Sequence, residues 1–286
     1  PYNKQAVWPS FTSAFNAPAG TAVFRSGWQE DARYLLLLAE HDDMLAKGHE
    51  QPDGTSIMMA GYGERFIIDA GYGSWSQSKE LSDPEDHSLV LVDGDGPRGS
   101  FYAYENGSQV ELENCRVESG LERCDARTVF NDTTQVRTVY FVEGQSFAVV
   151  DRMEPGDGDT HDYTSLWQLN AGGDTGGTFS SSSVGGQITR TKGGLTLGLA
   201  SSRGTPTLET ATSTYAPEYG VLAEHLTQAV GDDPAKRIGA TAGRVRHHHP
   251  DRLDWKRLDR VGAERRGGGC EGRYRDQHQC RDLHLH

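Results

Sequence analysis

Five polar residues between positions 49 and 87 have the types and spacing that chemistry at a sheet edge would need. His49, Gln51 and Asp53 precede one predicted strand. Asp69 ends the following strand, and His87 opens a third. Polar residues at strand ends can converge on one rim of a sheet, where histidine and aspartate are common Zn2+ ligands. The competing interpretation, which spacing alone favours, is that these residues belong to turns and caps.

The elements that must position these residues are strands. Short apolar and β-branched runs alternate with Gly- and Asp-rich turns, and almost no segment has helical periodicity. Strands are expected at residues 21–26, 34–39, 56–60, 65–69, 88–92, 136–142, 146–151, 188–191 and 195–200. This pattern predicts an all-β fold, an antiparallel β-sandwich.

Three segments carry more specific expectations. In the hairpin around Glu143-Gly144, alternation places Arg137, Val139 and Phe141 on one face. Residues 172–186 are predicted to form a Gly/Ser/Thr loop, and residues 220–230 are the one segment that could form a short helix.

The cysteine pair Cys115 and Cys124 lies on either side of Gly120, as if on two arms of a hairpin. An oxidising compartment would allow a disulfide between them. Two free buried thiols are the equal alternative.

Composition excludes several classes of protein. The 286 residues include 41 acidic and 28 basic side chains, a formal charge of −13. This acidity argues against a general nucleic-acid binder. No apolar run approaches the roughly 18 residues that a membrane span needs. Residues 1–235 hold 15 basic and 34 acidic side chains, a charge of −19, whereas residues 236–286 have a charge of +6.

Three segments follow from these patterns. Residues 1–19, punctuated by Pro and Gly, are expected to be an irregular lead-in, and residues 20–235 a sandwich domain. Residues 236–286 form a basic tail rich in Arg, His and Gly, in which the strand pattern stops. The tail is either a basic arm that grips a polyanion or a disordered or frame-shifted segment, and its lack of periodicity favours the second. With no initiating Met or signal peptide, the chain is expected to be a fragment or a processed product.

The same residues resemble the C-terminal β-sandwich domain of the heparinase II/III-like polysaccharide lyases. The matching pieces occur in that family's order: residues 23–28 (VFRSGW), 49–53 (HEQPD), 63–72 (GERFIIDAGY), 87–94 (HSLVLVDG) and 136–152 (VRTVYFVEGQSFAVVDR). Each piece is a weak signal, but five in order identify the chain as similar to this family over about residues 20–170.

The resemblance implies one Zn2+ ion held by a His, an Asp and a second His. The Asp corresponds to Asp69 and the later His to His87, but Gln51 occupies the position of the first ligand. A neutral amide binds Zn2+ more weakly than imidazole does. Three outcomes stay open: the neighbouring His49 replaces Gln51 as ligand, the metal is weakly bound, or the metal is lost.

The resemblance also implies an activity, β-elimination in a uronate-containing, acidic polysaccharide. His49 and Tyr72 are the candidate catalytic residues, with a turn or core role as the alternative; Lys47 and Arg65 are candidates for substrate binding, or are merely solvated. In that family an N-terminal α/α toroid supplies much of the catalytic equipment. Because the toroid is missing here, the chain is expected to be inactive alone, and to be periplasmic or secreted. The alternative is a non-catalytic carbohydrate-binding or structural module.

Overall fold

The computed structural model describes residues 8–39, 51–74, 81–97, 109–202 and 205–231, and all structural statements below concern these residues. They belong to the first of the two units into which the chain divides, Pro1–Gly243. Lys47, His49 and the predicted tail 236–286 lie outside the described residues. The predicted domain boundaries stay predictions.

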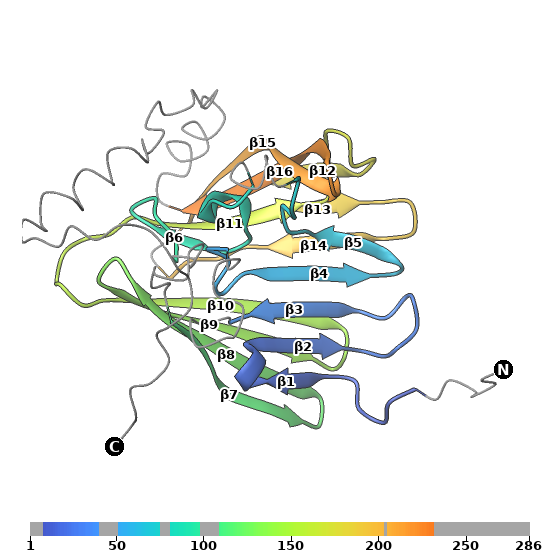
Figure 1. Ribbon diagram of the computed structural model, residues 1–286, viewed down its shortest axis with the longest axis horizontal. Coiled ribbons are helices and arrows are strands. Elements are labelled where there is room, and N and C mark those ends of the chain that lie inside the picture. The colour runs from blue at the N-terminus through green and yellow to red at the C-terminus, as the bar shows by residue number, and fades with distance from the viewer. Residues whose placement is uncertain (1–7, 40–50, 75–80, 98–108, 203–204, 232–286) are drawn as a thin grey trace, which may run out of the picture. The chain divides into compact units, whose positions relative to one another are not determined.

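The described strands form three antiparallel sheets (Figure 1). The nine-stranded sheet has the order β1-β2-β3-β4-β5-β11-β16-β15, with β6 paired to β11. Its strands are β1 (Ala14–Asn16), β2 (Thr21–Arg25), β3 (Tyr34–Leu38), β4 (Ile57–Gly61), β5 (Glu64–Ile67), β6 (Val90–Val92), β11 (Tyr163–Leu169), β15 (Thr207–Glu218) and β16 (Val221–Gly231).

Two smaller sheets complete the sandwich. The four-stranded sheet has the order β10-β9-β8-β7, and the three-stranded sheet the order β12-β13-β14. Their strands are β7 (Val110–Glu118), β8 (Leu121–Phe130), β9 (Thr133–Val142), β10 (Ser146–Pro155), β12 (Thr178–Ser182), β13 (Gly185–Thr189) and β14 (Gly194–Gly198). The 3-10 helices η1 (Ala17–Ala19) and η3 (Pro84–Asp86) have three residues each. The all-β sandwich predicted from the sequence is confirmed.

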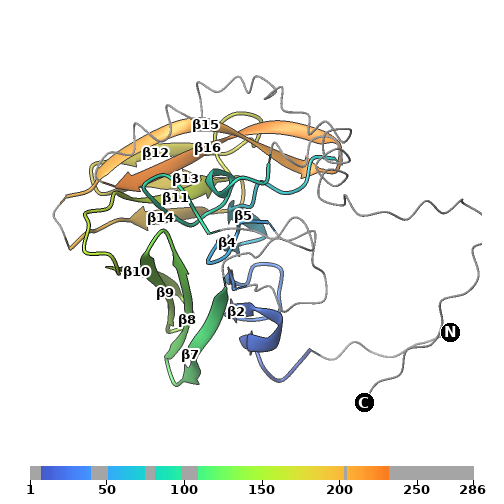
Figure 2. The same cartoon turned by 60° about the vertical axis from the view of Figure 1, so that its left-hand side comes forward.

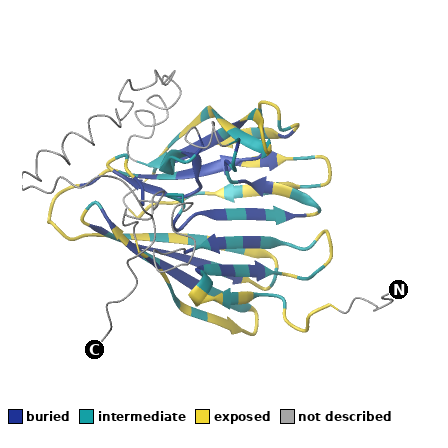
Figure 3. Cartoon of the chain, viewed as in Figure 1, coloured by how far each residue is buried: buried dark blue, intermediate teal, exposed yellow. Residues whose placement is uncertain are grey.

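One hydrophobic core joins the three sheets. It contains Phe24 and Leu35 from the large sheet, Val139 and Phe141 from β9, and Ile188 from β13, all fully or almost fully buried. Figure 2 shows the four-stranded sheet facing β2 across this core. Burial alternates residue by residue along β2, β3 and β4 (Figure 3), as expected for strands with one face on the core.

The prediction of a helix at residues 220–230 is wrong, because this segment is strand β16. It pairs with β11 on one side and with β15 on the other, so two partner strands satisfy its backbone and override a weak local helical pattern.

The Gly/Ser/Thr loop predicted at residues 172–186 contains strand β12. Phe179 of this strand packs against the core, and Gly186 on β13 leaves room for its ring: a Cβ there would lie 2.3 Å from Phe179 Cζ. The irregular lead-in likewise contains β1 and η1, and the Phe15 ring of β1 meets Phe24 edge-on with centroids 5.2 Å apart.

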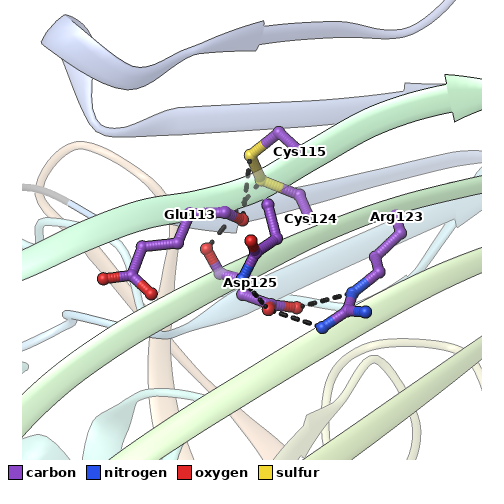
Figure 4. The surroundings of a disulfide bond; sticks show 6 residues. Glu113, Cys115, Arg123, Cys124 and Asp125 are labelled. Atoms are coloured by element: carbon purple, nitrogen blue, oxygen red, sulfur yellow. Dashed lines mark hydrogen bonds and ion pairs between the residues drawn. A yellow bond between two sulfur atoms is a disulfide. The ribbon is translucent and has the colours of Figure 1, made fainter.

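Cys115 on β7 and Cys124 on β8 form a disulfide (Figure 4), which decides between the two alternatives for this pair. Beside the disulfide, Arg123 donates to Asp125 through Nε at 3.0 Å and through Nη2 at 2.6 Å. Asn114 donates to the same carboxylate at 2.9 Å. The hairpin is therefore joined by one covalent bond and one bidentate ion pair.

Neither 3-10 helix is long or apolar enough to cross a membrane, and the described residues contain no other helix that is.

Candidate functional site

The structure brings Asp69 and His87 together. Asp69 follows β5 and His87 follows η3, and Nδ1 of His87 lies 2.8 Å from Oδ2 of Asp69. The His87 side chain is fully buried, whereas Asp69 is 21% exposed. Nε2 of His87 is buried and has no hydrogen-bond partner among the described residues. The pair thus presents a carboxylate at the surface and leaves one unused imidazole nitrogen beneath it.

A tight turn after β5 fixes the carboxylate. The Gly71 N–H donates to Oδ1 of Asp69 at 2.8 Å, which leaves Oδ2 for His87. Gly71 has φ of +72°, and a Cβ there would lie 2.9 Å from the carbonyl oxygen of Ala216. The turn is pinned to β15 because the Ala216 N–H donates to Ala70 O at 2.7 Å. Glycine at position 71 is therefore required by both backbone conformation and space.

The backbone around His87 is held by hydrogen bonds from three directions. Its N–H donates to Pro84 O, which closes η3. Nε2 of Gln168 on β11 donates to Glu85 O at 2.8 Å and to His87 O at 3.1 Å. The Ser88 N–H donates to Ser56 Oγ at 3.2 Å. The histidine therefore has little freedom to move away from Asp69.

A buried arginine connects this region to the second sheet. Arg137 on β9 is 1% exposed and donates to both oxygens of Asp151, at 2.8 and 2.9 Å. Its Nη1 donates to the carbonyl oxygens of Thr55 at 2.9 Å and Ser88 at 2.7 Å. Thr55 has φ of +71°, which is unusual for a β-branched residue, and Ser88 adjoins His87. The guanidinium thus ties together the two segments that flank the candidate site.

Both partners of the Asp69–His87 pair are shifted toward their charged forms. Burial disfavours the imidazolium, but the hydrogen bond and charge of Asp69, together with two further carboxylates nearby, outweigh it and raise the pKa of His87. For Asp69, burial opposes ionisation, but the hydrogen bonds from His87 and Gly71 outweigh it and lower the pKa. The pair is therefore an imidazolium–carboxylate ion pair.

Tyr72 lies at the rim of the same region and stacks on Tyr219, with ring centroids 6.2 Å apart and planes 12° from parallel. Tyr219 is in the turn between β15 and β16 and is 69% exposed. The Gly220 N–H bonds to Gly73 O, which joins the two tyrosine-bearing segments. The predicted catalytic Tyr72 is thus part of an aromatic pair beside the Asp69–His87 pair.

The remaining predicted site residues are placed differently. Gln51 is half-buried, and Asp53, two residues on, is one of the carboxylates whose charge raises the pKa of His87. Arg65 is exposed at the start of β5, at the opposite end of the strand from Asp69. The structure therefore does not bring Arg65 to the Asp69–His87 pair.

The fit of this region to a zinc ion is incomplete in the described part of the chain. Asp69 and His87 offer two suitable donors, and the unpartnered Nε2 of His87 is free to bind a ligand. No group of three or more His, Cys, Asp or Glu side chains that could hold a metal occurs among the described residues. A zinc site with three protein ligands would need a further donor, such as the amide of Gln51.

A second histidine, His161, bridges two carboxylates elsewhere in the unit. Its Nδ1 lies 2.6 Å from Asp93, and its Nε2 lies 3.1 Å from Asp157. Because a carboxylate only accepts, both bonds need the doubly protonated ring. Hydrogen bonds to Asp93 and Asp157 raise the pKa of His161 accordingly. The two Asp-Gly stretches of the sequence are thus turns tied to one imidazolium.

Comparison with known proteins identifies the family. The family described as Heparinase II/III-like, C-terminal, matches residues 17–255, most of the chain. The fold and this match together define an all-β domain of the polysaccharide-lyase type. The chain belongs to the heparinase II/III-like C-terminal family. A search of curated proteins finds no match.

Solved structures agree on the fold. A heparinase III matches with a TM-score of 0.67 and 16% identity, over 80% of this chain and 34% of the other. The heparan sulfate lyase HepC from Pedobacter heparinus matches with a TM-score of 0.67 and 20% identity, over 80% of this chain and 35% of the other. This chain therefore spans about a third of the length of these proteins.

Proposed function

We propose that this chain is the β-sandwich portion of a lyase that cleaves a uronate-containing, acidic polysaccharide by β-elimination. The observation that carries the proposal is the Asp69–His87 ion pair, which stands where two of the family's characteristic residues fall. The two similar structures are a heparinase III and a heparan sulfate lyase, which supports an acidic polysaccharide as substrate.

The reaction needs three services. A base removes the proton α to the uronate carboxylate, an acid protonates the departing glycosidic oxygen, and the carboxylate must be neutralised. In this proposal Tyr72 and His49 face the reacting sugar, and Tyr219 orients Tyr72 by stacking on it. Asp69 and His87 hold the rim on which Tyr72 sits, because the turn that follows Asp69 carries Tyr72.

The chain alone is proposed to be inactive. The similar structures are about three times its length, so the remaining catalytic groups would come from a helical domain that this sequence does not include. The α/α toroid is the expected partner. A disulfide forms and persists in oxidising compartments, so Cys115–Cys124 supports a periplasmic or secreted location.

Zn2+ belongs to the proposal only as an ion that Asp69 and His87 would hold with a third ligand, Gln51 or His49. When bound, it would stabilise the rim that carries Tyr72. Metal analysis tests this part: zinc should be lost in Asp69→Ala and in His87→Ala, and zinc content unchanged in both would exclude the site.

The activity is tested by joining the chain to the helical domain encoded upstream and following the ultraviolet absorbance of unsaturated uronate products. Heparan sulfate and alginate are suitable substrates. We expect products from the joined protein, none from the chain alone, and a large loss in Tyr72→Phe. Absence of product from the joined protein with every uronate polymer would refute the lyase proposal and leave the alternative, a carbohydrate-binding module.

A further inference from the structure

A row of outward-facing side chains crosses four strands of the large sheet, far from Asp69 and His87. Strand register pairs Arg25 with Tyr34, Tyr34 with Ala60, and Ala60 with Arg65. Directly paired residues of antiparallel strands share one face of the sheet. Three strand spacings of about 4.8 Å separate the backbones of Arg25 and Arg65 by about 14 Å.

This face is the outer one. The residues that alternate with the row along β2, β3 and β4 are Phe24, Leu35 and Met59, all of which are in the core. The row therefore points away from the smaller sheets, toward the surface.

A hollow interrupts the row at its smallest member, Ala60. A pocket of about 370 Å³ is lined there by Ala60, Arg65 and the turn between β4 and β5, with Glu64 and Arg190 on its walls. This volume lies within the range of small-molecule sites, roughly 300–1,000 Å³. The short Ala60 side chain thus provides space for a ligand group beside the Arg65 guanidinium.

The charges around the pocket are unevenly paired. Glu64 is neutralised by Nε of Arg190 at 2.9 Å, and Glu30 by Nζ of Lys192 at 2.9 Å. Arg65 is exposed and has neither an ion pair nor a side-chain hydrogen bond among the described residues. An anion entering the pocket would therefore meet an unused cation, while the two carboxylates are already compensated.

Arg25, at the other end of the row, is held over aromatic rings. Its guanidinium lies 4.1 Å from the ring centroid of Trp28 and 5.6 Å from that of Tyr34. Its one side-chain hydrogen bond among the described residues goes to Gly27 O, at 3.2 Å. Trp8 stacks on Trp28 and is 64% exposed. Rigid aromatic faces next to an arginine suit both the apolar face and the acidic group of a sugar ring.

We propose that the row Arg25–Tyr34–Ala60–Arg65 is a binding site for an acidic saccharide chain, separate from the rim that carries Asp69 and His87. The choice of an acidic saccharide rests on the proposed function. Arg25 and Arg65 bind carboxylate or sulfate groups on successive parts of the chain, and the hollow at Ala60 takes up one ring. The site lies at the end of β5 opposite Asp69, four residues or about 13 Å along the strand.

The test measures binding of a heparin-derived hexasaccharide to the whole chain by titration calorimetry, with a neutral dextran oligosaccharide as the comparison ligand. Arg65→Ser should weaken Kd about tenfold, and Arg25→Ser together with Arg65→Ser about a hundredfold, because charge-assisted hydrogen bonds are lost. Arg152→Ser is the matched control, since that side chain is 66% exposed and lies on β10. It should leave Kd unchanged.

A local readout separates this row from binding elsewhere on the chain. The indole N–H signal of Trp28, assigned by comparison with Trp28→Phe, should shift when the hexasaccharide is added to the wild type and stay in place in the double variant. An unshifted Trp28 signal in the wild type, an unchanged Kd in the double variant, or an equal loss in Arg152→Ser would each overturn the site. Equal affinity for a single-stranded DNA oligonucleotide would overturn the assignment to saccharides.

The fate of this site and that of the lyase proposal can be told apart. A toroid-joined protein that produces no unsaturated uronate, but binds the hexasaccharide through Arg65, refutes the lyase proposal and supports the site. A joined protein that produces unsaturated uronate while the double variant binds as the wild type does refutes the site alone.

Discussion

Replacing Arg137 by Met should be among the most destabilising single changes in this unit. The substitution removes the guanidinium and retains much of the side-chain volume, so the loss comes from polar contacts rather than from a cavity. Asp151 would keep the 3.1 Å bond from Gln135 as its remaining partner among the contacts described here. The Thr55 carbonyl oxygen would lose its 2.9 Å bond from Nη1.

The magnitude follows from the burial of the pair. Removing one partner of a buried ion pair typically costs about 3–5 kcal/mol. Asp151 is 19% exposed and can recover some hydration, so the lower end of that range, about 3 kcal/mol, is expected. Domains of this kind have total stabilities of roughly 5–15 kcal/mol, so Arg137→Met would use up a large fraction. Arg137→Met with Asp151→Leu should recover most of the loss, because no charge is then left unpaired.

Urea unfolding followed by tryptophan fluorescence measures these differences, provided that the dependence of ΔG on urea concentration is unchanged. Arg152→Met is the control, because this exposed side chain neighbours Asp151 in sequence and should change stability by less than about 0.5 kcal/mol. A loss below about 1 kcal/mol for Arg137→Met, or a double variant no more stable than the single one, would refute the view that this buried pair is a major tie between the sheets.

Three further predictions concern other parts of the unit. The folded-state pKa of His161 is raised, so its contribution to stability is full below its unfolded pKa of about 6.5 and is lost as pH rises through the folded pKa; His161→Asn should flatten that part of the pH profile of thermal unfolding. Reduction of Cys115–Cys124, or Cys115→Ser with Cys124→Ser, should lower stability by at most about 3 kcal/mol, because the closed loop is short; an unchanged denaturation midpoint would contradict this. Gly71→Ala should cost more than Gly158→Ala in urea unfolding, because both have positive φ but only position 71 lacks room for a Cβ; equal losses would remove the steric argument.

Most of the fold could be predicted from alternation and turn residues. The β9–β10 hairpin is the clearest example, because Glu143 and Gly144 have φ of +50° and +64° and join strands whose register the pattern had indicated. Strand β16 could not be predicted, since what makes it a strand is pairing with β15 and β11, which are distant interactions rather than local propensity. Strand β12 was hidden for the same reason by its Ser-rich composition.

The site was partly predictable. The convergence of Asp69 and His87 was expected from strand ends, and alternation placed Arg137 on the same face as Val139 and Phe141. An arginine on a core face is a recognisable signal of a buried ion pair, although the partner cannot be chosen from sequence. Tyr219 had no such signal, because its contact with the Asp69 turn depends on where a remote hairpin ends.

The electrostatics of the unit explain why the two ends of the large sheet can act separately. Residues 1–235 carry a formal charge of −19, so an acidic polysaccharide is repelled by most of this surface and needs local cations to bind. Screening at physiological salt limits the reach of each charge to about 8 Å, less than the roughly 13 Å of strand between Arg65 and Asp69. Arg65 therefore cannot assist ionisation chemistry at the Asp69–His87 rim through space. Any influence of the arginine row on catalysis must come from a saccharide long enough to contact both ends, so Arg65→Ser should raise KM for long chains and leave that for short oligosaccharides unchanged.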